Sequence, residues 1–179
     1  MFELKPISKE AIPRSLEKVE RYRLLNEPEQ AESICRDILR AEPENQAAAA
    51  ALLLALTDQF GKPRVDPNPA REALALLKDE YERAYYDGII CERWARAQLQ
   101  HAMPGHVVLD WLREAMRLYE RAEAVAPAGN EDAVLRWNTC ARMVDGDIRL
   151  KVRHEDISSD AGFGDEAPPH QTRPRRPSG

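Results

Sequence analysis

The chain has 179 residues, with 26 basic and 31 acidic side chains and a formal net charge of −5. It contains 25 Ala and 18 Leu but only 19 β-branched residues, which disfavours a sheet-based fold because helices draw on Ala and Leu and strands on β-branched residues. The acidic balance argues against general nucleic-acid binding, and no apolar run reaches the roughly 18–20 residues of a membrane span.

Three helices are predicted in the first third of the chain. The first covers residues 9–25, where apolar residues recur at helical spacing. Pro28 suits the first position of a second helix, over about residues 28–41, because its missing N–H is not needed there. Asn45 is a candidate N-cap for a third helix over residues 46–60, which is apolar on most sides and is therefore expected to be buried.

Four more helices are predicted, separated by turns that contain Pro and Gly. Asn68-Pro69 begins a fourth helix that runs to about Tyr86, and Asp87-Gly88 is predicted to be a turn. The last three helices are expected over residues 89–103, 106–125 and 130–144. Short connections make successive helices antiparallel, so the sequence predicts an all-α array of helical hairpins with about seven helices.

The pattern divides the chain into three parts. Residues 1–8 are expected to form a lead segment, residues 9–146 a helical repeat domain, and residues 147–179 a flexible tail. The end of the chain lacks periodicity and combines Pro, Gly and scattered charges, which is typical of disordered segments.

Two of the predicted helices share a spacing pattern that ends in proline. The patterns are Ala31-x3-Cys35-x2-Ile38-Leu39-x3-Pro43 and Ala115-x3-Tyr119-x2-Ala122-x4-Pro127. In a hairpin array the small residue allows two helices to approach closely, and the larger residue fills the space between hairpins. The proline sets the turn into the next hairpin because it cannot continue the helix.

On these positions the chain resembles the tetratricopeptide repeat (TPR) family over about residues 10–145. Residues 111–127 match best and residues 22–45 next. The middle repeat, residues 46–86, is divergent, because Glu80 stands where a small residue is usual and no proline follows. The resemblance implies about three repeats and a C-terminal capping helix in a right-handed superhelix. The alternative is a generic helical bundle with accidental spacing.

The resemblance also implies a function, because the first helix of each hairpin lines the concave side of such arrays. It predicts a protein–protein interaction module that binds another protein or peptide there, with no nucleic acid or membrane as partner. The expected partner-binding residues are Glu20, Arg23, Leu54, Asp58, Arg96, Leu99, Asn138 and Arg142. The alternative is a small acidic secretion-type chaperone of TPR architecture that binds an apolar client.

The family's best-known binding site is a clamp of basic and amide side chains around a C-terminal carboxylate. Residues without a basic or amide group stand where that clamp needs one, namely Leu16, Glu20, Ala51 and Glu92, and only Arg96 fits. We therefore expect no clamp of this kind.

No residues with the spacing of a catalytic, cofactor or metal site are found. His101 and His106 are five residues apart, whereas two metal ligands on one helix need i, i+4 spacing. The three cysteines form no CxxC pair, so we expect buried, reduced thiols. Residues 1–6 contain no apolar h-region, so we expect no secretory signal. These observations predict a cytoplasmic protein that is not an enzyme and has no cofactor.

Overall fold

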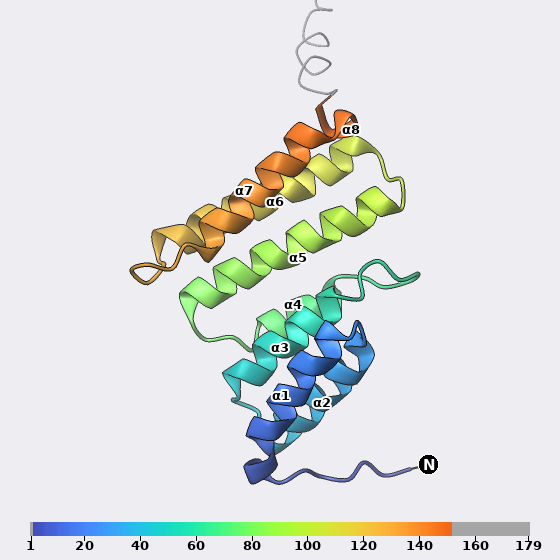
Figure 1. Cartoon of the computed structure of the whole chain (residues 1–179), viewed down its shortest axis with the longest axis vertical. Helices are drawn as coiled ribbons and strands as arrows, with labels where there is room; N and C mark the ends of the chain where they lie inside the picture. Colours follow the sequence, from blue (N-terminus) through green and yellow to red (C-terminus); the bar gives the residue numbers. More distant parts are fainter. Residues whose placement is uncertain (1, 152–179) are drawn as a thin grey trace, which may run out of the picture.

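The computed structural model describes residues 2–151, which are helical apart from residues 2–8 and the connections between helices. A 3-10 turn, η1, precedes the first α-helix, and successive helices run back and forth (Figure 1). The elements are η1 (Lys9–Ala11), α1 (Ile12–Leu24), α2 (Pro28–Ala41), α3 (Gln46–Thr57), α4 (Asn68–Leu74), α5 (Glu80–Gln100), α6 (Gly105–Ala124), α7 (Asp132–Gly146) and α8 (Ile148–Lys151). The prediction of an all-α fold with about seven helices is confirmed.

Each helix packs on the next one along the chain, and alternate helices α1, α3 and α5 also touch. In Figure 1, α1, α3, α5 and α7 lie toward the viewer, and α2, α4 and α6 lie behind them. This surface, formed by α1, α3, α5 and α7, is called the first-helix face below.

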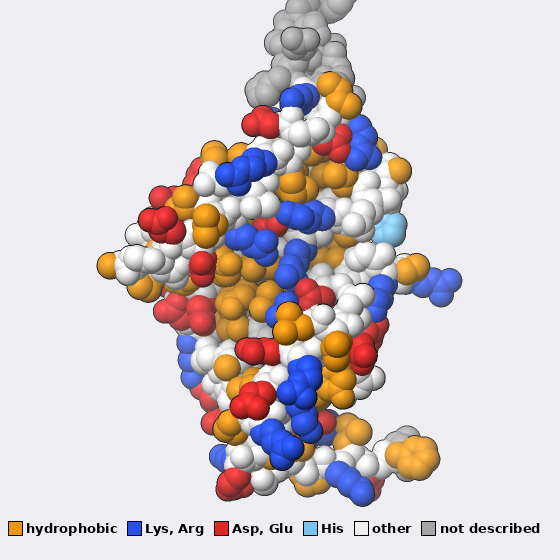
Figure 2. Space-filling model, in the orientation of Figure 1, with side chains coloured by type: hydrophobic (Ala, Val, Ile, Leu, Met, Phe, Trp, Pro, Cys, Tyr) orange, Lys and Arg blue, Asp and Glu red, His pale blue; other side chains and the backbone are white. Residues whose placement is uncertain are grey.

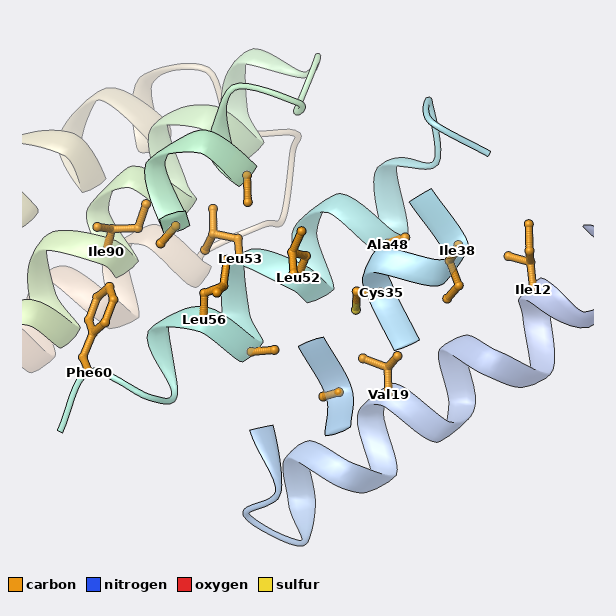
Figure 3. Packing of buried hydrophobic residues seen from close by; sticks show 14 of the residues in the cluster. Ile12, Val19, Cys35, Ile38, Ala48, Leu52, Leu53, Leu56, Phe60 and Ile90 are labelled. Carbon is orange, nitrogen blue, oxygen red and sulfur yellow. The ribbon is translucent and has the colours of Figure 1, made fainter. Parts of the chain in front are cut away.

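A first hydrophobic core fills the space between α1, α2, α3 and α4 (Figure 3). Val19, Cys35 and Ile38 are completely buried in it, as is Leu53. Because α3 is apolar nearly all round, it can bury its surface against α2, α4 and α5 at once. The prediction that this helix is central is confirmed, although it ends at Thr57 rather than residue 60.

The helix α5 joins this core to a second one. Ile90 is completely buried among residues of α1–α4, whereas Cys91 and Ala95 are buried among residues of α6, α7 and α8. Its contact with α6 is the most extensive between any two helices. One long helix therefore takes part in both halves of the described chain.

The predicted fourth and fifth helices are wrong in their boundaries. The helix α4 ends at Leu74, and α5 begins at Glu80 and continues through the Asp87-Gly88 pair that was predicted to be a turn. Gly88 is inside α5 because the helices cross closely there: a β-carbon on it would lie 2.5 Å from Cε1 of Tyr119. Its role is close packing and not chain reversal.

Three positions of each repeat pattern are completely buried in the structure. Ala31, Cys35 and Ile38 in α2 are completely buried, and so are Ala115, Tyr119 and Ala122 in α6. Pro43 and Pro127 follow the ends of these two helices. The divergent middle unit has a second helix of only seven residues, α4. Membership of the TPR family stays a prediction.

The first residues of the segment predicted to be a tail are helical. They form α8, and Leu150 is buried against the second core. The predicted flexibility of the remainder, residues 152–179, concerns positions outside the described residues.

Candidate functional site

The structure brings several of the predicted partner-binding residues together on the first-helix face. Arg23 in α1 and Asp58, which follows α3, form an ion pair with Nε to Oδ2 at 2.7 Å. Arg93 in α5, which was not predicted, approaches Asp58 from the other side and donates to Oγ1 of Thr57 at 2.7 Å. One carboxylate thus links three successive first helices of the array.

A second carboxylate, Glu92 in α5, lies deeper. Its side chain is 1% exposed, and one oxygen accepts a hydrogen bond of 2.8 Å from the hydroxyl of Tyr119. The other oxygen, Oε1, is 3.0 Å from Nη2 of Arg96 and 3.5 Å from Nη1 of Arg136 in α7. Every buried side-chain nitrogen or oxygen in the described part has a hydrogen-bond partner.

These six residues, Arg23, Asp58, Glu92, Arg93, Arg96 and Arg136, are called the arginine cluster below. Four guanidinium groups meet two carboxylates, which leaves a surplus of two positive charges on a chain whose net charge is −5. Figure 2 shows basic side chains gathered along the middle of the first-helix face, beside hydrophobic ones.

The charges of the cluster influence one another. Burial lowers the pKa of Arg93; the carboxylate of Asp58 opposes this effect, and the positive charges of Arg23 and Arg136 add to it. Burial acts against the charged form of Arg136 as well, but Glu92 and neighbouring tyrosine hydroxyls outweigh it, so the pKa of Arg136 is raised. The arginines are therefore close enough to repel one another and are held in place by two anions.

Two hollows flank Asp58 on this face. One, of about 450 Å³, is lined by Glu20, Arg23 and Asp58 together with the turn between α1 and α2. The other, of about 260 Å³, is lined by Asp58, Arg93 and Arg96 with the end of α5. The part of the cluster around Asp58 is therefore accessible from two sides.

The other predicted site residues contribute differently. Leu54 is half-buried and packs against both cores, and its carbonyl oxygen accepts from Arg93 at 3.3 Å. Leu99 is half-buried against the second core. Asn138 is half-buried on α7. Arg142, on the same helix, is exposed and forms no ion pair within residues 2–151. Arg142 is the one of these four that is open to a partner.

Sequence reasoning missed Glu92, Arg93 and Arg136 as site residues. The i, i+4 spacing of Glu92 and Arg96 is a signal for an ion pair on one helix surface. A buried tyrosine such as Tyr119 also requires a partner for its hydroxyl. No sequence signal, however, pairs Arg136 with a carboxylate 44 residues away.

The described residues offer little for covalent chemistry. Burial raises the pKa of Cys35, Cys91 and Cys140 to about 12 in each case, which keeps the thiols protonated near neutral pH. Within residues 2–151 no three His, Cys, Asp or Glu side chains are grouped so as to hold a metal ion. No helix in this part combines the length and the apolar character needed to cross a membrane.

No family model matches this chain, and no curated protein or solved structure is significantly similar to it.

Proposed function

We propose that this protein is a protein–protein interaction module of TPR-like architecture, which binds a partner protein or peptide on its first-helix face. One observation carries the proposal: four arginines and two carboxylates from α1, α5, α7 and the end of α3 come together, and two hollows flank the Asp58 end of this cluster. Such a face offers several charged donors within reach of one extended or helical segment.

The proposal includes no catalytic activity and no cofactor. The two carboxylates of the arginine cluster are bound in ion pairs with arginine, and the three thiols are buried. Free buried thiols fit the reducing environment of the cytoplasm, where we propose the protein acts.

The alternative proposal is a secretion-type chaperone for an apolar client. Such a client needs an apolar binding surface, whereas the middle of the first-helix face carries a surplus of positive charge. This charge favours a polar partner and hence the first proposal.

Affinity purification of the full chain followed by mass spectrometry tests the proposed function. The informative variant is the double substitution Arg96→Glu, Arg142→Glu, because both residues are exposed and belong to α5 and α7, two of the helices that form the first-helix face. Leu54 and Leu99 are unsuitable, since they pack against the cores and their replacement by Glu would also disturb folding.

The matched control is Arg117→Glu on α6, whose side chain is 56% exposed and paired with Glu114. We expect partners that wild type and the control retain and the double variant loses. Partners that persist unchanged on the double variant would contradict the proposal.

A further inference from the structure

We infer that the partner segment is acidic: the arginine cluster binds side-chain carboxylates of a peptide segment from another protein. The inference rests on the proposed function and adds the chemical class of the partner. It depends on the local surplus of two positive charges, which is opposite in sign to the charge of the whole chain.

Arg96 and Arg136 are the groups best placed to meet such a segment. Both contact the same oxygen of Glu92, so their guanidinium groups lie side by side. A guanidinium carries five N–H donors. Each of these two arginines makes one contact with Glu92, and Arg136 also interacts with the hydroxyl of Tyr85. The side chain of Arg96 is 45% exposed and that of Arg136 28%, so donors of both face the solvent.

The two arginines are ordered before the partner arrives. Glu92 is buried and hydrogen-bonded to Tyr119, which is itself completely buried. On the other side of the cluster, Asp58 holds Arg23 and Arg93. Binding therefore costs less side-chain entropy than it would with free arginine side chains, and bidentate arginine–carboxylate contacts become accessible.

Carboxylates fit this face better than a nucleic-acid backbone does. A phosphate backbone calls for an extended basic surface, whereas the surplus of the cluster is two charges and Glu20 stands exposed at the rim of the adjoining hollow. A short acidic segment can reach the arginines and avoid Glu20.

The test uses a fluorescent peptide rich in Glu, amidated at its C-terminus, and a second peptide with Gln at every Glu position. Amidation separates side-chain carboxylates from a terminal one. Fluorescence anisotropy with the full chain at low salt should show binding of the Glu peptide only. Its affinity should fall as salt is raised, because the charges are partly exposed.

Two substitutions locate the binding. Arg96→Gln should weaken binding of the Glu peptide by about tenfold or more, because it removes charge-assisted hydrogen bonds. Its fold should persist, since Glu92 keeps Arg136 and Tyr119 as partners, and thermal unfolding checks this. Arg117→Gln is the matched control and should bind as wild type does. Glu20→Gln should bind the Glu peptide more tightly.

The inference is overturned if wild type binds neither peptide, binds both equally, or binds the Glu peptide unchanged in Arg96→Gln. It is also overturned if a single-stranded RNA binds more tightly than the Glu peptide and Arg96→Gln weakens that binding. In each of these cases the proposed function still stands if Arg96→Glu, Arg142→Glu loses the partners that wild type captures. If that variant keeps them, both the inference and the proposed function fail.

Discussion

Gly88 lies where α5 crosses α6, and the ring of Tyr119 occupies the space that a β-carbon would need. The nearest ring atoms would be 2.5 and 2.8 Å from that carbon. The ring cannot move aside easily, because it is completely buried and its hydroxyl donates to Glu92. The absence of a side chain at residue 88 therefore determines how closely the two helices approach.

Replacing this glycine should destabilise the protein although alanine is the better helix former. We expect Gly88→Ala to lower the free energy of unfolding by up to about 2 kcal/mol, because an overpacking cost of about 1–3 kcal/mol outweighs the gain of about 1 kcal/mol in helix propensity. Urea unfolding followed by circular dichroism measures this difference.

Gly146→Ala is the control for this substitution. Gly146 is the last residue of α7, and a β-carbon there would meet no atom within 4 Å. The free energy of unfolding of Gly146→Ala should match or slightly exceed that of wild type. Equal stability of Gly88→Ala and Gly146→Ala would refute the close-packing role.

Among the helices, α5 differs most from its predicted form, and its N-terminus shows why. Asp79 caps the helix, and its side chain accepts a hydrogen bond of 2.9 Å from the backbone N–H of Glu82. Asp followed three residues later by Glu resembles the spacing of a capping box, so the sequence held a signal for this start. The apolar run of residues 73–77 instead favoured a single helix that continues past Asp79.

The contribution of the Asp79 N-cap to stability can be tested by substitution. Asp79→Ala should lower the free energy of unfolding by about 1 kcal/mol, because one N–H in the first turn loses its acceptor. Thermal or urea unfolding provides the measurement, and Arg83→Ala, an exposed change one turn further on, serves as control. No difference between the two variants would mean that the start of α5 is set by packing alone.

In the molecule as a whole, two cores meet at α5. Ile90 faces the core of α1–α4, and the neighbouring residues Ile89 and Cys91 face that of α6–α8. In arrays of this kind stability is roughly a sum of the stabilities of the units and of the interfaces between neighbours. Cooperative unfolding of the two halves therefore depends on the face of α5 that carries Ile90.

Weakening this interface should separate the unfolding of the two halves. Ile90→Ala creates a cavity at a completely buried position and should cost about 2–5 kcal/mol. Trp94 packs against the first core and Trp111 lies beside Arg71 of α4, so both are replaced by Phe in every protein of this experiment, wild type included. Fluorescence of the remaining Trp137, which packs against the second core, then reports on that core, and far-ultraviolet circular dichroism reports on all helices.

In wild type the two urea curves should coincide, and in Ile90→Ala the circular dichroism curve should move to lower urea than the fluorescence curve. Val19→Ala, at a completely buried position in the end helix α1, is the control and should change stability with a smaller separation of the curves. Coincident curves in both variants would show that the interface does not limit cooperativity.

The sequence by itself determined the helical class and most helix ends. Prolines mark several of these places: Pro28 stands at the start of α2, and Pro43 and Pro127 follow α2 and α6. Asn45 caps α3 as predicted, accepting from the backbone N–H of Ala48. These features are local, because a missing N–H or a capping oxygen acts within one turn of helix. They can therefore be recognised from the sequence alone.

Only the tertiary structure decided the role of Gly88 and the composition of the arginine cluster. A glycine in a turn and a glycine at a helix crossing look alike in sequence, since the difference is the ring of Tyr119, 31 positions further on. Glu92 likewise meets Tyr119 and Arg136 from two other helices. Partners so distant along the chain are set by how helices pack, and local patterns do not encode that packing.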